Sequence, residues 1–402
     1  MKKLLLVLIY TCSSLAQVEL EDKIGQMILV GFRGSKITNN HQIVKDIEKY
    51  KIGSVILFDY DVKKKSKKRN IISKKQVRSL TTDLQSHSKV PLLITVDQEG
   101  GLVQRLKQRH GFTKVLSPQE VGEKDSASFT YRESKKIALD LKNAGINLNF
   151  SPSADVNTNT SNPVIGKIRR SYSQDPYKVS FHVREFIKSH HDLGVATTLK
   201  HFPGHGSSKS DSHKGFVDVT DTWHEKELIP FVEMINEERV DILMSAHIFH
   251  GGLDPHYPGT LSHNVITKLL REELGYEGVV ISDDMNMKAI SEHYGLERAI
   301  ELSINAGVDI LLYGNNLVYE KKIAKKVTGI IKSLIKSGKV SEARIDESYN
   351  RIMNLKKKMN LISNYTSTSS KKRKIASKES IINSDNFRKN KEQFKYLKMM
   401  ED

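Results

Sequence analysis

Apolar segments rich in β-branched residues recur along this chain, and helix-forming segments lie between most of them. This alternation constrains the fold more than any other feature, because repeated strand–helix units form parallel sheets. The apolar segments cover residues 27–32, 54–58, 92–96, 147–150, 196–199, 240–245, 278–281 and 309–313. Amphipathic helical patterns occupy residues 41–51, 74–85, 126–143, 175–193, 226–238 and 265–273. Eight such units predict an α/β fold, a (β/α)₈ TIM barrel, whose usual size is about 250 residues or more. A doubly wound open sheet is the alternative, but it normally has fewer strands.

A barrel makes a prediction that the sequence itself can test, because reactive residues should follow the carboxyl ends of the strands. Titratable side chains do follow five of the apolar segments. They are Asp97 and Glu99, Asp155 and Arg170, Lys200, His247, and the pair Asp283 and Asp284. The sequence therefore predicts one site at this end of the barrel.

The N-terminus has the pattern of a secretory signal peptide. Two lysines precede an apolar run over residues 4–10, and Ser14 and Ala16 occupy the −3 and −1 positions of a cleavage site. The run is too short for a permanent membrane span, which needs about 20 residues. We expect residues 1–16 to be removed and the protein to be exported, to a periplasmic or extracellular location. Lipid attachment at Cys12, the only cysteine, is the alternative processing route.

The end of the chain differs in composition from the rest. We expect a last helix over residues 341–359, so that the barrel domain covers residues 17–361, followed by a basic, flexible tail at 362–402. The net charge of +17 comes mostly from dispersed lysines, with concentrations at residues 63–69 and in the tail. The tail could contact an anionic cell envelope. We expect a monomer that does not bind nucleic acid, since no interleaved aromatic or Gly-rich motif appears.

The segment LKHFPGHGSSKSDSHKG, at residues 199–215, concentrates the chemistry. Its Pro and Gly residues predict a strand tip that opens into a mobile loop. The loop carries His201, His205, Asp211 and His213, which are hard to explain as packing in a Gly/Ser-rich segment. The Asp-x-His spacing lets the Asp211 carboxylate orient the His213 imidazole, whose free pKa is about 6.5. This arrangement suits proton transfer.

Three further segments place charged residues at strand ends. VDQEGGLVQRL, at 96–106, delivers Asp97 and a flexible Gly pair, and NPVIGKIRRSYSQDP, at 162–176, brings adjacent arginines, one of which could face solvent. In GVVISDDMNMKAI, at 278–290, strand alternation would put Asp283 and Asp284 on opposite sides. Only one of them would then face the barrel axis, and the other would cap a helix.

These motifs together resemble glycoside hydrolase family 3, in its single-domain β-N-acetylglucosaminidase (β-N-acetylhexosaminidase) clade. The resemblance rests on KHFPGHG with a following DSH, VDQEGG with VQR, NPVIG with a following RSYSQDP, and SDDMNM, over residues 20–360. It implies a TIM barrel, a retaining mechanism, Asp283 as nucleophile, and His213 as acid/base supported by Asp211. It also implies sugar contacts from Asp97, Arg105, Arg170, Lys200 and His201. The implied substrate is an N-acetylglucosamine-containing oligosaccharide or muropeptide, and we expect no cofactor and no metal.

Physical chemistry explains why a histidine can serve here. A retaining glycosidase needs a nucleophile below the sugar ring and a proton donor at the leaving oxygen, which later acts as a base toward water. An imidazole can do both steps, and it adds no second negative charge near the glycosyl-enzyme. A donor on a Gly/Ser-rich loop also implies that residues 204–210 close over the substrate and open for product release.

Three alternatives remain at this point. A zinc hydrolase would use His201, His205 and His213 as nitrogen ligands. A non-catalytic cell-wall glycan-binding protein would keep the sugar contacts without needing the Asp–His pair. A family 3 enzyme of other sugar specificity, or an N-acetylglucosaminide phosphorylase, would keep the fold and change the substrate or the acceptor.

Overall fold

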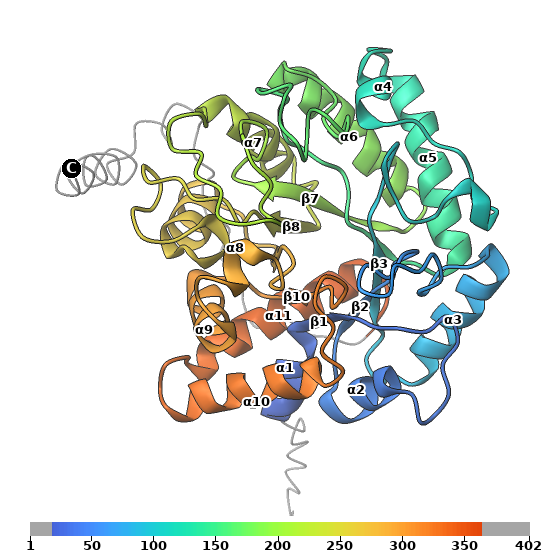
Figure 1. The fold of residues 1–402 in the computed structure, drawn as a ribbon, viewed down its shortest axis with the longest axis vertical. Coiled ribbons are helices and arrows are strands. Elements are labelled where there is room, and N and C mark those ends of the chain that lie inside the picture. The colour runs from blue at the N-terminus through green and yellow to red at the C-terminus, as the bar shows by residue number, and fades with distance from the viewer. Residues whose placement is uncertain (1–17, 364–402) are drawn as a thin grey trace, which may run out of the picture.

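Eight parallel strands close into a barrel in the computed structural model, which describes residues 18–363 (Figure 1). The strands are β1 (Ile28–Gly31), β2 (Ser54–Ile56), β3 (Leu93–Val96), β6 (Leu148–Asn149), β7 (Ala196–Phe202), β8 (Ile242–Ser245), β9 (Val279–Ser282) and β10 (Leu311–Tyr313). Their order is β10-β1-β2-β3-β6-β7-β8-β9. The Ile310 N–H donates to Val280 O at 3.1 Å and joins β9 to β10. The predicted (β/α)₈ barrel is confirmed.

The strands are short and buried on both faces, as a parallel barrel requires. Every residue of the eight barrel strands is buried, and Leu, Ile and Val dominate them. These side chains join one continuous apolar core that extends outward to the helices. The unbroken apolar segments in the sequence have this double burial as their cause.

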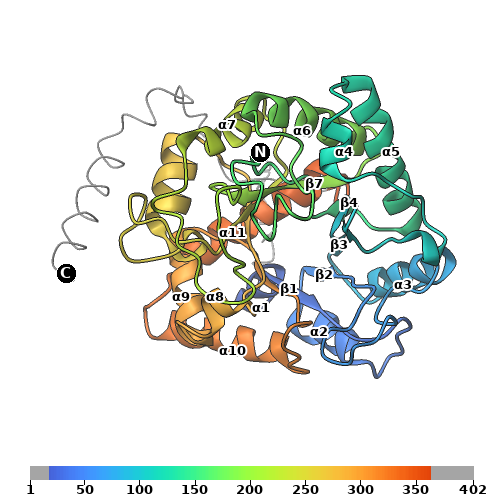
Figure 2. The same ribbon diagram turned by 45° about the horizontal axis from the view of Figure 1, so that its top comes forward.

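Helices surround the strands and bury one face each. The main ones are α1 (Leu20–Gln26), α2 (Gln42–Tyr50), α3 (Lys74–Ser86), α5 (Ala127–Ala144), α6 (Pro176–His191), α7 (Ile229–Asn236), α9 (Leu296–Ala306), α10 (Ile323–Lys336) and α11 (Glu342–Lys358). In α3, Val77, Leu80 and Leu84 form the buried stripe, and Ser73 caps the first turn by accepting from the Gln76 N–H at 3.2 Å. In both views α10 lies beside α1 and α2, so the two ends of the barrel domain are neighbours (Figures 1 and 2).

Further helical elements lie in the connections between these helices and the strands. They are η1 (Gln108–His110), α4 (Pro118–Gly122), η2 (Glu225–Leu228), η3 (Gly259–Leu261), η4 (Asn264–Glu273) and α8 (Lys288–Ser291). The helix expected over residues 226–238 is divided between η2 and α7, with Pro230 in the first turn of α7. Proline suits that position, because the first turn of a helix leaves its N–H groups unpaired in any case.

Strand β7 is longer than expected, and this changes the account of the loop that follows. The strand runs on through Lys200, His201 and Phe202, so the first two are strand residues and do not follow the strand. Residues 204–208 are buried, whereas Lys209, Ser210, His213 and Lys214 are exposed. The expectation of a mobile segment over residues 204–210 is therefore wrong for residues 204–208, which pack into the interior.

A hairpin follows β3 and shapes the end of the barrel. It consists of β4 (Gln98–Gly100) and β5 (Val103–Gln104), with Gly100 at φ +109. A Cβ at Gly100 would lie 2.0 Å from the Leu116 carbonyl oxygen, so both the backbone angle and the packing require glycine. The turn places Arg105 back beside Asp97.

The expected signal peptide at 1–16, the lipidation alternative at Cys12 and all but the start of the tail at 362–402 lie outside the described residues. Within residues 18–363, no helix is long and apolar enough to cross a bilayer.

Candidate active site

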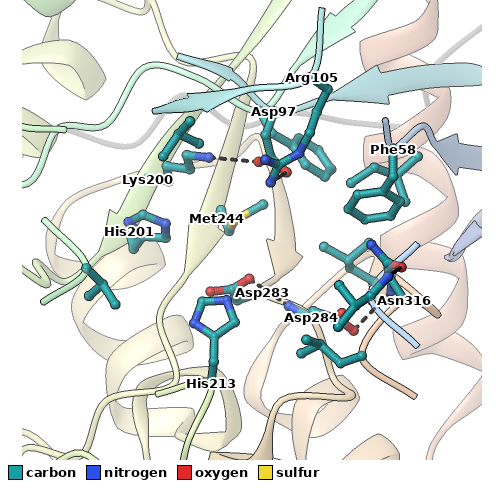
Figure 3. Close-up of a pocket in the computed structure, with 18 of the residues that line it drawn as sticks. Phe58, Asp97, Arg105, Lys200, His201, His213, Met244, Asp283, Asp284 and Asn316 are labelled. Carbon is teal, nitrogen blue, oxygen red and sulfur yellow. Dashed lines mark hydrogen bonds and ion pairs between the residues drawn. The ribbon is translucent and has the colours of Figure 1, made fainter. Parts of the chain in front are cut away.

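One pocket of about 430 Å³ lies among the carboxyl ends of the strands and the loops that follow them. It collects all eight residues that the sequence put forward as site residues, and Figure 3 labels all of them except Arg170 and Asp211. These are Asp97, Arg105, Arg170, Lys200, His201, Asp211, His213 and Asp283. Residues almost 190 positions apart in the sequence thus share one cavity.

A network of buried charges forms one wall of the pocket. Lys200 Nζ lies 3.0 Å from Asp97 Oδ1 and 2.7 Å from Glu99 Oε1. Arg170 grips Glu99 with two nitrogens, each 2.8 Å from a carboxylate oxygen. The side chain of Glu99 is fully buried, whereas that of Asp97 is 18% exposed. Glu99 therefore positions the two cations, and Asp97 presents its carboxylate to the cavity.

Both carboxylates in this network remain ionised. Burial alone would raise the pKa of Glu99, but the Arg170 and Lys200 cations beside it outweigh burial and lower the pKa to about 2. Burial also opposes ionisation of Asp97, and Lys200 and Arg105 bring its pKa below the usual value. Arg105 NH2 lies 3.3 Å from Asp97 Oδ2. An ionised carboxylate accepts hydrogen bonds, so Asp97 is suited to hold the hydroxyl groups of a ligand.

His201 is fixed on both sides of its ring. Its Nδ1 lies 2.7 Å from Asp155 Oδ2, and its Nε2 lies 3.2 Å from Arg170 NH2. Arginine can only donate, so Nε2 accepts and Nδ1 carries the hydrogen. Asp155 also accepts the backbone N–H of His205 at 2.8 Å. This fully buried carboxylate thereby connects β7 to the loop that follows it.

His205 does not line the pocket, and it packs in the interior. Its Nδ1 lies 2.6 Å from Ser208 Oγ and its Nε2 lies 3.3 Å from Ser212 Oγ. Burial lowers its pKa to about 4, with a further contribution from His201, so its imidazole is neutral at pH 7. The expectation that this histidine would be hard to explain as packing is wrong. The serines of the loop supply the partners that its apolar content does not.

Asp211 and His213 form the expected pair. The His213 Nδ1 lies 2.8 Å from Asp211 Oδ1, and the same oxygen accepts the His213 backbone N–H at 2.9 Å. Partial burial would raise the pKa of Asp211, but these hydrogen bonds from His213 bring it below the usual value. The side chain of His213 is 50% exposed, and its ring lies beside the Asp283 carboxylate (Figure 3). With Nδ1 engaged, Nε2 is the ring nitrogen left for a substrate.

Asp283 and Asp284 both border the pocket, and this corrects the expectation that they face opposite sides. Strand β9 ends at Ser282, so the alternation of a strand does not extend to them. Asp284 Oδ1 accepts the backbone N–H groups of Asn286 and Gly314, each at 3.0 Å. Asp284 thus holds a turn together, whereas the Asp283 carboxylate accepts a single hydrogen bond within residues 18–363, from the Asp284 N–H at 2.7 Å.

The two carboxyl groups have opposite pKa shifts. Burial raises the pKa of Asp283, but the imidazoles of His247, His201 and His213 outweigh burial and bring it below the usual value. Burial raises the pKa of Asp284 to about 6, with a contribution from the charge of Asp283. At neutral pH Asp283 is the more readily ionised of the two.

His247 does not line the pocket and contacts it through the main chain. Burial lowers the pKa of His247, and its Nε2 lies 3.1 Å from Asp284 O.

The structure settles which of the two arginines in NPVIGKIRRS faces the site. Arg170 is buried and lines the pocket, whereas Arg169 is exposed. Arg170 NH1 also donates to the Val164 carbonyl at 2.9 Å, so the guanidinium is held from three directions.

Sequence reasoning missed the other wall of the pocket. Phe58, Tyr60 and Val62 follow β2, and Asn316 and Leu317 follow β10. The rule that directs attention to strand ends would have found them, because both stretches directly follow predicted strands. Phe58, Val62 and Leu317 carry no titratable group, so a search of the sequence for titratable and metal-binding side chains does not find them.

The three histidines of the loop do not converge on one point. The partners described above occupy both ring nitrogens of His201 and of His205. Within residues 18–363, no group of three or more His, Cys, Asp or Glu side chains is arranged to hold a metal ion.

Comparisons with known proteins agree with this geometry. Residues 19–355 match the sequence profile of the glycosyl hydrolase family 3 N-terminal domain. The chain is 33% identical over 351 residues to "Beta-hexosaminidase A" of Pseudoalteromonas piscicida, covering 81% of this chain and 57% of that protein. It is 31% identical over 333 residues to a "Beta-hexosaminidase" of Alkalilimnicola ehrlichii, covering 81% of this chain and 88% of that protein.

Solved structures give the same result. A family 3 β-N-acetylglucosaminidase from a Paenibacillus species matches with a TM-score of 0.79 and 34% identity, over 94% of this chain and 68% of that one. A β-N-acetylhexosaminidase from Beutenbergia cavernae matches with a TM-score of 0.76 and 25% identity, over 85% of this chain and 99% of that one.

Proposed function

The chain belongs to glycosyl hydrolase family 3, and from that premise we propose that it is a retaining exo-β-N-acetylglucosaminidase. The proposed reaction releases terminal β-linked N-acetylglucosamine from glycans derived from the cell wall. One observation carries the proposal. The Asp283 carboxylate and the His213 imidazole, which Asp211 orients, lie side by side in the same pocket (Figure 3).

In the first step Asp283 attacks C1 of the sugar, and the bond from C1 to the leaving oxygen breaks. His213 as imidazolium gives its Nε2 proton to that oxygen, while Asp211 stabilises the positive ring. In the second step the neutral imidazole takes a proton from water, the water oxygen bonds to C1, and Asp283 leaves as a carboxylate. Two displacements at one carbon retain its configuration.

The charges around the sugar suit these steps. The lowered pKa of Asp283 keeps it ionised and able to attack at neutral pH. Asp97, Arg105 and Lys200 lie on the opposite wall, where donors and acceptors can hold the hydroxyl groups. Preorganised groups of this kind position the reacting carbon without further rearrangement.

The test begins with the purified protein and p-nitrophenyl β-glycosides of N-acetylglucosamine, glucose and xylose. We expect the N-acetylglucosaminide to react fastest, with the β-anomer formed first when the product is followed by NMR. The Asp283→Ala variant should fold normally and lose several orders of magnitude in kcat. The α-anomer as first product, or a mechanism-based fluoro-sugar that labels Asp284, would overturn the assignment.

Two rival activities are separated in the same assay. A phosphorylase would release sugar 1-phosphate and would accelerate when phosphate is added. A binding protein would retain the glycan without any turnover.

A further inference from the structure

A lysine-rich turn stands at the mouth of the pocket. Residues 61–69, here called the lysine turn, are closed by main-chain hydrogen bonds between Asp61 and Ser66, at 2.8 and 3.2 Å. The turn exposes five lysines, at positions 63, 64, 65, 67 and 68. The sequence concentrates positive charge here, and the reaction described above does not use it.

Buried groups hold the base of the turn firmly. Asp61 is buried and accepts from Arg33 Nε at 2.6 Å. At the other end, buried Arg69 donates to Asn316 Oδ1 at 2.7 Å and to the Asn315 carbonyl at 2.8 Å. The lysines are therefore carried on a fixed support, and their position relative to the pocket is defined.

The same support forms the wall of the pocket. Tyr60 and Val62 flank Asp61 and line the cavity, and the Val62 N–H donates to Asn316 Oδ1 at 3.1 Å. Leu317 lines the cavity beside Asn316. Tyr60, Val62 and Leu317 are all exposed large hydrophobic side chains. A group that leaves the pocket on this side passes an apolar surface and then meets the lysines.

The positive charge at this mouth is not neutralised locally. Asp59 is shared by Lys107 and Arg109, at 2.7 and 2.6 Å, and Asp61 by Arg33 and Arg69. Each carboxylate thus faces two cations. Among residues 18–363, none of the five lysines of the turn has an ion-pair partner.

We propose that the lysine turn binds carboxylate groups on the aglycone, so that the preferred substrate is an N-acetylglucosaminide whose leaving group is polyanionic. This inference rests on the proposed function, because it deals with the part of the substrate beyond the cleaved bond. A single exposed ion pair contributes little. Five like charges on a fixed turn, however, attract a polyanion over about 10 Å at ordinary salt. Tyr60, Val62 and Leu317 would hold the apolar part of the same aglycone.

The test uses two aryl N-acetyl-β-glucosaminides that differ only in a short peptide attached to the aryl ring. One peptide contains glutamates and the other contains glutamines, so the leaving oxygen is the same and only charge differs. We expect the glutamate substrate to have a kcat/KM about tenfold higher at low salt, and this ratio to shrink toward one at high salt. Replacing all five lysines of the turn by glutamine should bring the ratio close to one at low salt.

A matched variant controls for the net charge of the whole protein. Five exposed lysines on α2, α5 and α10, which have no ion pair among the described residues, are replaced by glutamine in the same way: Lys45, Lys142, Lys325, Lys326 and Lys336. This control should keep the wild-type ratio. Each ratio compares two substrates on one variant, so a change in basal activity cancels.

Three results have distinct meanings. Equal rates for both peptides on the wild type would overturn the inference and leave the proposed activity standing. An equal fall of the ratio in both five-lysine variants would also overturn it, because general charge would then be the cause. Failure to cleave either peptide substrate or the p-nitrophenyl N-acetylglucosaminide would overturn the proposed function itself.

Discussion

At the level of single residues, the proposed chemistry depends on His213, whose Nδ1 lies 2.8 Å from Asp211 Oδ1 and whose Nε2 has no partner among residues 18–363. If Nε2 delivers the proton, His213→Ala should slow natural glycans by orders of magnitude, because their leaving oxygen needs protonation. Formation of the covalent intermediate from p-nitrophenyl substrates should slow much less. Asp211→Asn should give a milder form of the same pattern, since the imidazole remains. Pre-steady-state kinetics with both substrate types measure this, and equal slowing of both would assign His213 to binding.

The adjacent arginines provide a second comparison at this level. Arg170→Ala leaves the buried Glu99 carboxylate with Lys200 alone, so we expect the free energy of unfolding to fall by about 3–5 kcal/mol and activity to be lost. Arg169→Ala, one position away, changes an exposed side chain and should stay within about 0.5 kcal/mol. Urea denaturation and kcat/KM together check the pair. Similar losses of stability and activity in the two variants would contradict the buried position of Arg170 and the exposed position of Arg169.

The eight proposed site residues could be taken from the sequence because each belongs to a motif or follows an apolar segment. The buried carboxylates that pair with these residues could not be predicted in this way. Glu99 and Asp155 are ordinary carboxylates in the sequence, and only the closing of the barrel brings Glu99 to Arg170 and Asp155 to His201. Pairing across 46 and 71 positions is a property of the fold, and no local pattern encodes it.

At the level of elements, Glu227 in η2 lies beneath the buried half of the loop at 204–208. Its Oε2 accepts the Gly206 N–H at 2.8 Å, and Gly204 packs directly on its side chain. Burial raises its pKa to about 7, so at pH 5–6 the folded protein holds a proton there that the unfolded chain releases. The protonated Glu227 carboxyl group therefore gives its full stabilisation of the fold below about pH 4.5, and this stabilisation is lost as the pH rises through 7.

We expect Glu227→Gln to remove this dependence. The wild type should lose up to about 3 kcal/mol of unfolding free energy between pH 5 and pH 8, and the variant should not. Loss of the carboxylate acceptor can shift the stability of the variant, but by the same amount at both pH values. Denaturation with urea at both pH values measures this difference. Glu225→Gln, on the same short helix and partly exposed, is the control. A pH-independent difference between the Glu227 variant and the wild type would show that the carboxyl group is ionised throughout.

The strands and the long helices were predictable because burial on two faces or on one stripe leaves a clear periodicity. The C-terminal end of β7 was not predictable from periodicity. Lys200 and His201 are polar, and a pattern of apolar residues predicts the end of a strand where the apolar residues end. The strand continues because carboxylates on neighbouring strands and loops pair with these two side chains. They are Asp97, Glu99 and Asp155. Tertiary contacts decide the boundary of this element.

At the level of the whole molecule, the buried carboxylate of Asp309 ties the last helix to the barrel. Asp309, just before β10, contacts Arg271 at 2.7 Å and both Arg344 and Arg351 of α11 at 3.1 Å. Burial alone would raise its pKa, but these three cations outweigh burial and lower it to about 2. The stabilisation is thus present above about pH 4 and is lost as the pH falls through 2.

Asp309→Asn leaves three arginines facing a neutral amide. We expect the free energy of unfolding at pH 7 to fall by about 3–5 kcal/mol, with the kcat of the remaining folded protein unchanged. Asp346→Asn is the control, because this α11 carboxylate is 47% exposed and pairs with Lys23, so its loss should cost less than about 1 kcal/mol. Equal effects of the two substitutions on the urea midpoint would contradict the role given to Asp309.

The seam of the barrel, where Ile28 in β1 pairs with Leu311 in β10, sets an order of events during synthesis. At a synthesis rate of about 5–20 residues per second, β10 is made tens of seconds after β1. Until residue 313 has left the ribosome, β1 and β9 remain unpaired edges of apolar sheet, the kind of surface that chaperones cover and that aggregates when left open. The seam also supplies Gly314 and Asn316 to the pocket. A nascent chain therefore cannot act on a glycan before almost the whole barrel has been made.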